Sequence, residues 1–250
     1  MNNTPFHLTG KTVFITGASS GIGRQIAISG SEMGAKIVMT GRDKHRLEET
    51  YSLLKGEGHV ILTADLVDSE QIVSLVQELP QLDGVVMNAG IVNAYPLKFL
   101  TSEKIEETFS INFNAIVLLI AGIMRKRKLN KGGSVVFVSS ISSNFPPKGS
   151  AMYSSSKAAI EAFSKVLALE HSQQKIRSNC LAPGMVKTAL YNDVEQRVTK
   201  ESMDAHIASY PLGVGHPEDV ANAAVFLLSD ASKWITGTTI TLEGGCLLNG

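Results

Sequence analysis

The sequence predicts a doubly wound α/β domain, in which a parallel sheet of seven strands is covered by helices on both faces. Apolar runs alternate with amphipathic helical patterns from one end of the chain to the other. Each run is apolar on both of its faces, as strands of a buried parallel sheet are. The chain has 250 residues, of which 44% are hydrophobic and 18% charged. Such a chain can form one large core, and residues 1–250 are expected to form a single domain.

The expected elements alternate between the two types along the whole chain. Strands are expected where short apolar runs occur, at 11–16, 36–40, 59–64, 83–87, 134–139, 175–181 and 238–242. Helices are expected where apolar residues recur at helical spacing, at 21–33, 43–55, 69–78, 102–128, 152–171 and 217–228. We find no internal repeat and no linker that would divide the chain.

The charge balance disfavours several classes of partner. The formal net charge is zero and the pI is near 7.0, so no nucleic acid or acidic membrane surface is expected to be held by bulk electrostatics. The basic run 125–128 is interpreted as the solvated end of a helix, where cations suit the dipole. The apolar stretch 115–124 is shorter than the roughly 20 residues that span a bilayer, and no secretory signal is expected at the start.

The cysteines and histidines show no metal-binding pattern. Cys180 and Cys246 lie far apart in the sequence and form no redox or ligand spacing, which fits a reducing cytoplasm. The six histidines are not paired at ligand spacing. We therefore expect no metal site and a cytoplasmic location.

A glycine-rich loop follows the first expected strand. Gly17, Gly21 and Gly23 lie in the turn between that strand and the next helix. Their missing side chains let the backbone approach a pyrophosphate and let the helix pack on the strand, and the helix N-terminus offers N–H groups to the anion. Such a loop alone is a weak signal, but its place in the first βαβ unit favours a Rossmann-like dinucleotide site.

The end of the second expected strand bears on the choice of dinucleotide. An acidic residue there would hydrogen-bond the adenosine ribose, whereas an arginine can accept a 2′-phosphate. Here Gly41 takes the acidic position and Arg42 follows it, while Asp43 is interpreted as the N-cap of the next helix. A guanidinium binds phosphate with paired hydrogen bonds. We therefore expect NADP(H) to be preferred, with NAD(H) not excluded and a solvated loop arginine as the alternative reading of Arg42.

Tyr153 and Lys157 form the most informative pair. They are four residues apart on an expected helix, so they share one face. A neighbouring ammonium is expected to lower the pKa of the tyrosine from about 10. A phenol tuned in this way can act as a general acid or base. Taken alone, the pair is also common on solvated helices.

The motifs of the chain, taken in the order in which they occur along the sequence, resemble those of the short-chain dehydrogenase/reductase family. The resemblance covers the chain from about Leu8 to Gly245, and its C-terminal part is similar to 3-oxoacyl-carrier-protein reductases. It rests on Thr16-Gly-x-x-x-Gly-Ile-Gly23, Asn88-Ala-Gly90, Ser140, Tyr153-x-x-x-Lys157, Pro183-Gly184, Trp234-Ile-Thr-Gly237 and Glu243-Gly-Gly245. The length and glycine spacing are similar to the single-domain branch.

The resemblance implies a role for each catalytic candidate. Tyr153 would donate the proton in reduction and accept it in oxidation, while Lys157 would lower the pKa of Tyr153 and bind the nicotinamide ribose. Ser140 would orient and polarise the carbonyl oxygen. Asn112 would hold a water in the proton relay to Lys157.

The cofactor-binding residues follow from the same motifs. The resemblance places Asp65 near the adenine, Asn88–Gly90 at the cofactor floor, and the loop after 183 against the nicotinamide. Together with the glycine loop, the expected set is Gly17, Ser19, Ser20, Gly21, Ile22, Gly23, Arg42, Asp65, Leu66, Asn88, Ala89, Gly90, Tyr153, Lys157, Pro183, Gly184, Val186 and Thr188.

The serine-rich turn leaves the identity of the catalytic serine open. Ser139 is the main alternative to Ser140, but it would point to the opposite face of the strand. Ser142 and Ser143 also lie near, and many relatives have glycine at the position of Ser143. A serine in place of that glycine would alter substrate fit without removing the acid–base groups. Alternatively, the serines of this turn have a structural role only and hydrogen-bond the chain where it leaves the strand.

The segment 185–210 is expected to form a lid over the substrate. Its apolar residues suit a mobile amphipathic helix over an apolar pocket, or equally a surface helix that packs on the core. Candidate pocket walls are Asn93, Phe145, Met185 and Tyr191.

The leading hypothesis for function is an NADP(H)-dependent oxidoreductase that interconverts a ketone and a secondary alcohol, including a 3-oxoacyl thioester. Alternatives are a dehydrogenase of a sugar, polyol or steroid-like alcohol, and a protein that senses dinucleotides without turnover. The resemblance also implies a homo-oligomer, a tetramer or dimer, formed through two long helices and the C-terminal strand region.

Overall fold

The structure, a computed structural model, describes residues 4–188 and 200–248. Its centre is a seven-stranded sheet in which every neighbouring pair is parallel, in the order β3-β2-β1-β4-β5-β6-β7. The strands are β1 Thr12–Thr16, β2 Lys36–Gly41, β3 Val60–Thr63, β4 Leu82–Met87, β5 Leu129–Val138, β6 Arg177–Pro183 and β7 Thr239–Leu242. This confirms the doubly wound α/β prediction.

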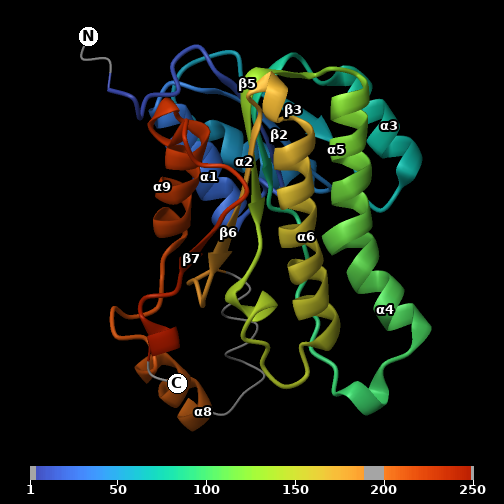
Figure 1. Cartoon of the computed structure of the whole chain (residues 1–250), viewed down its shortest axis with the longest axis vertical. Coiled ribbons are helices and arrows are strands. Elements are labelled where there is room, and N and C mark those ends of the chain that lie inside the picture. The colour runs from blue at the N-terminus through green and yellow to red at the C-terminus, as the bar shows by residue number, and fades with distance from the viewer. Residues whose placement is uncertain (1–3, 189–199, 249–250) are drawn as a thin grey trace.

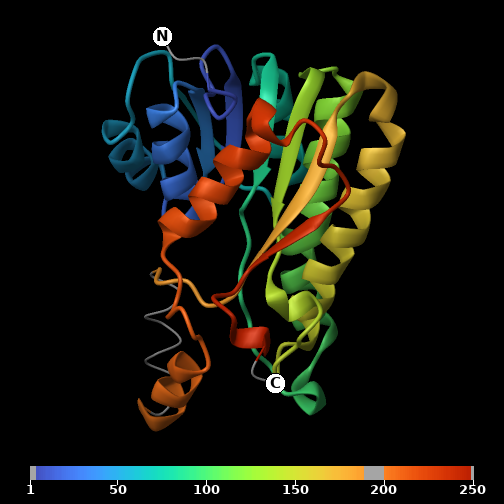
Figure 2. The same ribbon diagram turned by 60° about the vertical axis from the view of Figure 1, so that its left-hand side comes forward.

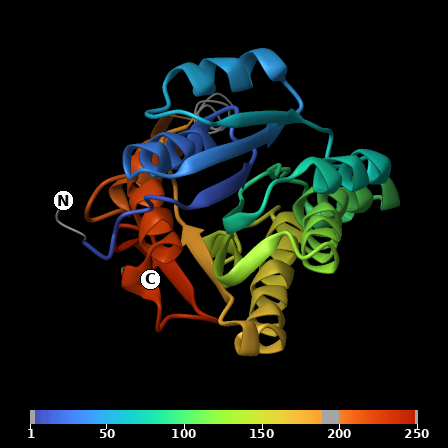
Figure 3. The ribbon, with the colours of Figure 1, turned by 90° about the horizontal axis from the view of Figure 1, so that it is seen from above.

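Helices cover both faces of the sheet (Figure 1, Figure 3). Helices α1 and α9 lie on one face, and α3, α5 and α6 lie on the other, as the two separate core clusters also show. The described α-helices are α1 Gly21–Glu32, α2 Lys44–Ser52, α3 Ser69–Glu78, α4 Ser102–Phe109, α5 Ala115–Arg125, α6 Ala151–Glu170, α8 Lys200–Ala208 and α9 Pro217–Leu228.

The strands divide their side chains between the two faces. In β1, Val13 and Ile15 belong to the core under α1 and α9, while Phe14 belongs to the core under α3, α5 and α6. All three are at most 1% exposed. Because successive side chains point to opposite faces of a strand, a run that is apolar throughout is buried on both sides, which is why the sequence pattern identified these strands.

The chain changes direction across the sheet between β1 and β4. These strands are neighbours, although β2 and β3 intervene in the sequence. Connections from their carboxyl ends therefore diverge and leave a crevice at that edge of the sheet. Helix α8 lies beyond the same edge (Figure 1, Figure 2).

Two predicted elements differ from the structure by more than the few residues at their ends by which others differ. The helix expected at 102–128 ends at Arg125 and contains a π turn, η2 (Ser110–Asn114), between α4 and α5. The strand expected to begin at Ser134 begins at Leu129. Arg125, Lys126 and Arg127 are exposed, as expected for a solvated helix end.

The helix formed by α4, η2 and α5 is longer than the apolar stretch 115–124 indicated. It spans Ser102–Arg125, 24 residues, and is long and apolar enough to cross a membrane by length and composition alone. Its buried side chains, which include Ile116, Leu119 and Ile123, pack in the core with α3. A core helix of a globular domain shows the same two properties.

A buried arginine joins β6 to the end of α9. Arg177 is 7% exposed, and its guanidinium donates to the Leu227 carbonyl at 2.8 Å, to the Ser229 carbonyl at 3.1 Å and to Ser232 Oγ at 2.7 Å. Burial lowers the pKa of Arg177 from its ordinary value. The cation thus lies at a helix C-terminus, where it satisfies carbonyls without a partner in the helix.

We expect Arg177→Met to lower the free energy of unfolding by about 2–3 kcal/mol, because it removes three buried hydrogen bonds that a charged donor makes. Urea denaturation would measure the change. Arg125→Met is the matched control, since Arg125 is exposed, and we expect it to change stability by less than about 0.5 kcal/mol. Equal stability of the two variants would contradict the role of Arg177.

Candidate active site

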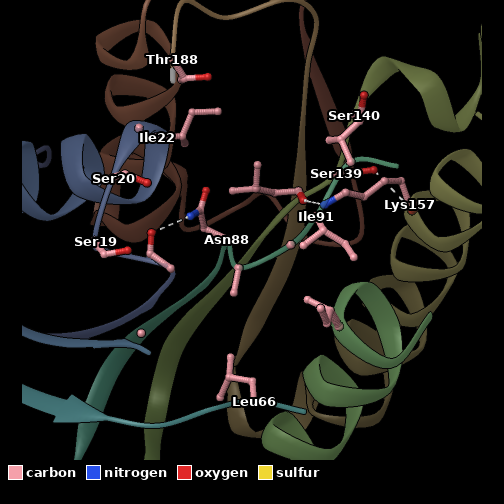
Figure 4. Close-up of a pocket in the computed structure, with 18 of the residues that line it drawn as sticks. Ser19, Ser20, Ile22, Leu66, Asn88, Ile91, Ser139, Ser140, Lys157 and Thr188 are labelled. Atoms are coloured by element: carbon pink, nitrogen blue, oxygen red, sulfur yellow. Dashed lines mark hydrogen bonds between the residues drawn. The ribbon is translucent and has the colours of Figure 1, made fainter. Parts of the chain in front are cut away.

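A cavity of about 470 Å³ lies at the carboxyl ends of β1, β4, β5 and β6. It combines the glycine loop, the end of β2, the turn after β4 and the first two turns of α6. Figure 4 shows Ser140 and Lys157 on one side, Ser19, Ser20 and Ile22 on the other, and Asn88 between them. Every residue of the expected cofactor-binding set except Gly23 lines this cavity, as does Ser140, whereas Asn112 does not.

Glycine is required at each of the three positions of the loop for a different structural reason. Gly17 and Gly21 have φ angles of +65° and +53°, the region in which side chains other than glycine are strained. Gly23 has an ordinary backbone, but a Cβ there would lie 2.3 Å from the Gly17 carbonyl oxygen and 2.4 Å from Asn88 Nδ2. Gly23 therefore allows α1 to pack closely on the loop without lining the cavity.

The N-terminus of α1 is open to an anion. Its N-cap residue, Ser20, has an extended backbone and makes no side-chain hydrogen bond to the helix. The first N–H groups of a helix have no partner inside the helix. They and the positive end of the helix dipole are therefore available to a phosphate in the cavity.

Thr16 holds the turn after β4 against the glycine loop. Its buried Oγ1 accepts from the backbone N–H groups of Asn88 at 3.0 Å and Ala89 at 3.1 Å. In return, Asn88 Nδ2 donates to the Gly17 carbonyl at 3.2 Å. Sequence reasoning included Thr16 in the motif but missed this role. Its position beside the first glycine was the only available signal.

Two arginines line the cavity at the end of β2. Arg42 was expected there, and Arg46 was not. Asp43 is the N-cap of α2 as predicted, because its side chain accepts from the Arg46 N–H at 3.1 Å. Residues four apart near a helix start lie on one side, a spacing from which Arg46 could have been recognised. Arg24 supports the same region by donating to the Ser19 carbonyl at 2.8 Å.

Asp65 lines the cavity on the side of β3, with Leu66 next to it. Its Oδ1 accepts from the Val67 N–H at 3.1 Å, and its own N–H donates to Gln71 Oε1 at 2.9 Å. These contacts fix the turn after β3. The sequence placed Asp65 in the cofactor set by resemblance alone.

Tyr153, Lys157 and Ser140 meet at one end of the cavity. Tyr153 lies in the first turn of α6, and its phenol lies close to the Ser140 hydroxyl. Lys157 is 4% exposed, and its Nζ lies 5.7 Å from the centre of the Tyr153 ring and donates to the Val138 carbonyl at 2.8 Å. The helix thus places an ammonium beside a phenol, as the spacing predicted.

The expected direction of the Tyr153 pKa is wrong for this structure. Burial raises the pKa of the phenol above its ordinary value and outweighs the opposing hydrogen bond from Ser140, although the residue as a whole stays partly exposed. Burial also lowers the pKa of Lys157 to about 8. The helical spacing indicated proximity correctly but gave no measure of the desolvation of both groups.

Ser139 and Ser140 direct their hydroxyls to different partners. Ser139 Oγ donates to Glu161 Oε1 at 2.7 Å, so it belongs to the contact between β5 and α6. Ser140 Oγ contacts Ser142 Oγ at 3.1 Å and the Tyr153 phenol. Of the two, Ser140 is the serine whose hydroxyl lies close to the phenol.

Asn112 lies within the π turn and is fully buried. Its Oδ1 accepts from the Ile91 N–H at 2.8 Å, and its Nδ2 donates to the Ile91 carbonyl at 2.9 Å. A Cβ on Gly90 would lie 3.1 Å from Asn112 Oδ1 and 3.6 Å from Lys157 Nζ. Asn112 therefore lies next to the lysine, with its side chain bonded to the turn after β4.

The substrate side is described in part. Pro183, Gly184, Val186 and Thr188 line the cavity, whereas Asn93, Phe145 and Met185 do not. Part of the expected lid, including Tyr191, lies outside the described residues. Its described helix α8 leads to Tyr210, which is 5% exposed and whose hydroxyl accepts from the Met185 N–H at 3.0 Å.

The fold and site together define a dinucleotide-binding oxidoreductase of the α/β class. A sequence profile of the family described as enoyl-(acyl carrier protein) reductase matches residues 17–246. The chain is 34% identical over 242 residues to a 3-oxoacyl-[acyl-carrier-protein] reductase of Rickettsia felis, with 96% of this chain and 98% of the relative covered. The chain belongs to the short-chain dehydrogenase/reductase family.

Solved structures agree with this assignment. A dehydrogenase/reductase of Sinorhizobium meliloti is 30% identical, with a TM-score of 0.88 and 97% of each chain covered. A Beutenbergia cavernae protein, described as an NAD(P)-dependent gluconate 5-dehydrogenase, holds NADP at low occupancy. It is 32% identical, with a TM-score of 0.87, and the match covers 98% of this chain and 100% of the other.

Proposed function

We propose that the protein is an NADP(H)-dependent oxidoreductase that interconverts a ketone and a secondary alcohol, with 3-oxoacyl thioesters as the leading substrate class. The observation that carries the proposal is the grouping of the Tyr153 phenol, the Ser140 hydroxyl and Lys157 Nζ, which lies 5.7 Å from the centre of the Tyr153 ring, at the end of a cavity that also contains an open helix N-terminus. A site that only binds needs no such proton donor.

The residues fit a nicotinamide dinucleotide. The open N-terminus of α1 suits its pyrophosphate, and Asn88–Gly90, Pro183, Gly184, Val186 and Thr188 line the same cavity. When bound, this cofactor supplies or accepts the hydride. We assign to Lys157 the binding of its ribose and to Asp65 a contact near its adenine.

The protein's own groups would handle the carbonyl oxygen and its proton. The Ser140 and Tyr153 hydroxyls can both donate to that oxygen and stabilise the negative charge that develops on it. The phenol of Tyr153 then gives its proton, and its raised pKa keeps that proton in place at neutral pH. Lys157 and Asn112, which both lie next to Gly90, are proposed to return a proton through water.

A panel of carbonyl substrates tests this function directly. Purified protein is mixed with NADPH and with acetoacetyl thioesters, simple ketones and keto sugars, and loss of nicotinamide absorbance is followed. We expect turnover of at least one ketone class, fastest with the thioesters. Turnover of the keto sugars alone would favour the sugar dehydrogenase alternative, the kind of activity in the description of the Beutenbergia protein. NADPH binding without any turnover would show a sensor.

The proposed NADP(H) preference rests on Arg42 and Arg46, which line the same part of the cavity. Each guanidinium can make charge-assisted hydrogen bonds to a 2′-phosphate. We expect Arg42→Ala and Arg46→Ala each to raise the Kd for NADPH by about 10- to 100-fold and to leave the Kd for NADH almost unchanged.

Fluorescence titration of both cofactors measures these constants. Lys44→Ala is the matched control, because Lys44 is exposed on the same helix and does not line the cavity. Equal losses for NADPH and NADH in the arginine variants would contradict a 2′-phosphate site.

The remaining expectations concern the whole molecule. We propose that residues 1–250 act as one domain, with 185–210 as the lid, in a reducing cytoplasm where both cysteines stay free thiols. We also propose a homo-oligomer, tetramer or dimer. It is supported by large exposed apolar side chains on α5 and α6, namely Leu118, Val166 and Leu169. Light scattering would measure the mass.

A further inference from the structure

A buried carboxylate lies one helical turn beyond the lysine of the site. Tyr153, Lys157 and Glu161 follow one another at four-residue spacing along α6 and so share a face. Glu161 is only 9% exposed. Burying a carboxylate is costly unless strong hydrogen bonds compensate, so its position calls for a specific set of partners.

The partners of Glu161 are two serines on either side of Ser140. Its Oε1 accepts from Ser139 Oγ at 2.7 Å and from Ser143 Oγ at 2.6 Å. Ser143 Oγ also contacts the Ser140 carbonyl at 2.8 Å. Hydroxyl-to-carboxylate bonds of this length are among the stronger hydrogen bonds in proteins.

These bonds fix the backbone on both sides of the proposed catalytic serine. β5 ends at Val138, whose carbonyl accepts from Lys157 Nζ, and the short helix η3 (Ile141–Ser143) follows Ser140. Helix α6 therefore holds the chain before Ser140 through Ser139 and after it through Ser143. The Ser140 hydroxyl itself is left to contact Ser142 and the Tyr153 phenol.

We infer that Glu161 is a positioning residue for Ser140: through Ser139 and Ser143 it sets the hydroxyl of Ser140 relative to the phenol of Tyr153. The inference rests on the proposed function. Misplacing a catalytic group by about 1 Å can cost about 100-fold in rate. An isosteric apolar residue would fill the same space without directing these hydroxyls.

Four variants separate positioning from packing and from charge. Glu161→Met removes the acceptor at similar length, and Glu161→Gln keeps an oxygen that can accept both hydroxyls. Ser140→Ala and the double variant Ser140→Ala/Glu161→Met complete a cycle. Turnover of an acetoacetyl thioester gives kcat and KM, and fluorescence titration gives the Kd for NADPH.

We expect Glu161→Met to lower kcat by about 10- to 100-fold, with KM and the Kd for NADPH changed less than about threefold. Glu161→Gln should stay within about threefold of wild type, because hydrogen bonding and not charge sets the geometry. In the Ser140→Ala background, Glu161→Met should cause no further loss, since a residue acting through Ser140 has nothing left to position.

The opposite results overturn the inference. They are multiplicative losses in the double variant, loss in Glu161→Gln equal to that in Glu161→Met, or wild-type kcat in Glu161→Met. If Glu161→Met does not fold, Ser143→Ala removes one of the two contacts and should show a smaller loss in the same pattern.

A crystal structure of Glu161→Met decides the geometry without turnover. Departure of the Ser140 hydroxyl from the Tyr153 phenol supports positioning, and an unchanged contact refutes it. Failure of the proposed function is separate: it shows in the wild-type protein, as NADPH binding with no turnover of any carbonyl.

Discussion

Replacement of Tyr153 by phenylalanine is expected to lower kcat for carbonyl reduction by about 1,000-fold or more, within the range of a lost general acid plus a lost oxyanion donor. The substitution removes one hydroxyl and keeps the ring. Because Ser140 remains, a single donor stays near the carbonyl oxygen, so residual turnover above the uncatalysed rate is expected. The Kd for NADPH should change less than about threefold, since the open N-terminus of α1 is untouched.

Steady-state reduction of an acetoacetyl thioester, with parallel NADPH titration, measures both quantities. Tyr51→Phe is the matched control, since Tyr51 is exposed on α2 and should leave kcat unchanged. Retention of most of the turnover in Tyr153→Phe with cofactor binding intact would exclude Tyr153 as the proton donor. A parallel loss of NADPH binding would show instead that the phenol mainly shapes the cofactor site.

The sheet could be predicted because its strands are apolar on both faces and bounded by polar turns. The bounds of α3 and α9 agree with the predicted ones. The start of β5 did not follow from the pattern, because residues 129–133 include Asn130, Lys131 and two glycines. Leu129 nevertheless pairs with Leu82, and the register shifts before Ser134, so the pairing depends on the neighbouring strand.

The π turn in the long helix could not be predicted from the sequence either. Residues 110–114 continue the helical pattern, and nothing local marks an extra residue in the turn. The cause lies elsewhere in the chain, since Asn112 makes two hydrogen bonds to Ile91. π turns of this kind often occur at functional sites, but only the folded contact reveals one.

The candidate site likewise contains residues that could be placed from the sequence and residues that could not. Groups that follow strands directly could be placed from the sequence, because the carboxyl ends of parallel strands meet at one edge. Thr16, Arg46 and Glu161 were missed, since their roles depend on contacts with distant residues. The pKa direction of Tyr153 was wrong for a related reason: sequence spacing shows which groups are neighbours, but burial is a property of the whole fold.

Replacement of Lys157 by methionine should separate activity from stability. Burial lowers the pKa of Lys157 from 10.5 to about 8, so the folded protein holds this proton less tightly than the unfolded chain. At pH 7 both states are protonated, and the charged lysine costs the folded state about 3 kcal/mol relative to an unburied one. Between pH 8 and 10.5 the unfolded chain binds the extra proton, so stability attributable to Lys157 rises with pH through this range.

Methionine removes that cost but leaves the Val138 carbonyl without its 2.8 Å donor, a loss of about 1–2 kcal/mol. At pH 7 we therefore expect a net gain of about 1–2 kcal/mol, or about 2–8 °C in Tm for a chain of this size. The gain should shrink above pH 8 and turn into a loss of about 1 kcal/mol toward pH 10.5, where only the lost hydrogen bond to Val138 remains. Turnover should fall by about 100-fold or more, because the proton relay is lost.

Thermal unfolding at pH 7 and pH 10 tests the expected change in stability, and carbonyl reduction at pH 7 tests the expected loss of turnover. Lys165→Met is the control: Lys165 is exposed on the same helix, so neither Tm nor turnover should move. A Lys157→Met protein less stable than wild type at pH 7 would mean that the ammonium is held by more than the Val138 carbonyl, and that its desolvation is compensated. A gain in stability with loss of turnover would instead identify a strained functional group, retained at the expense of stability.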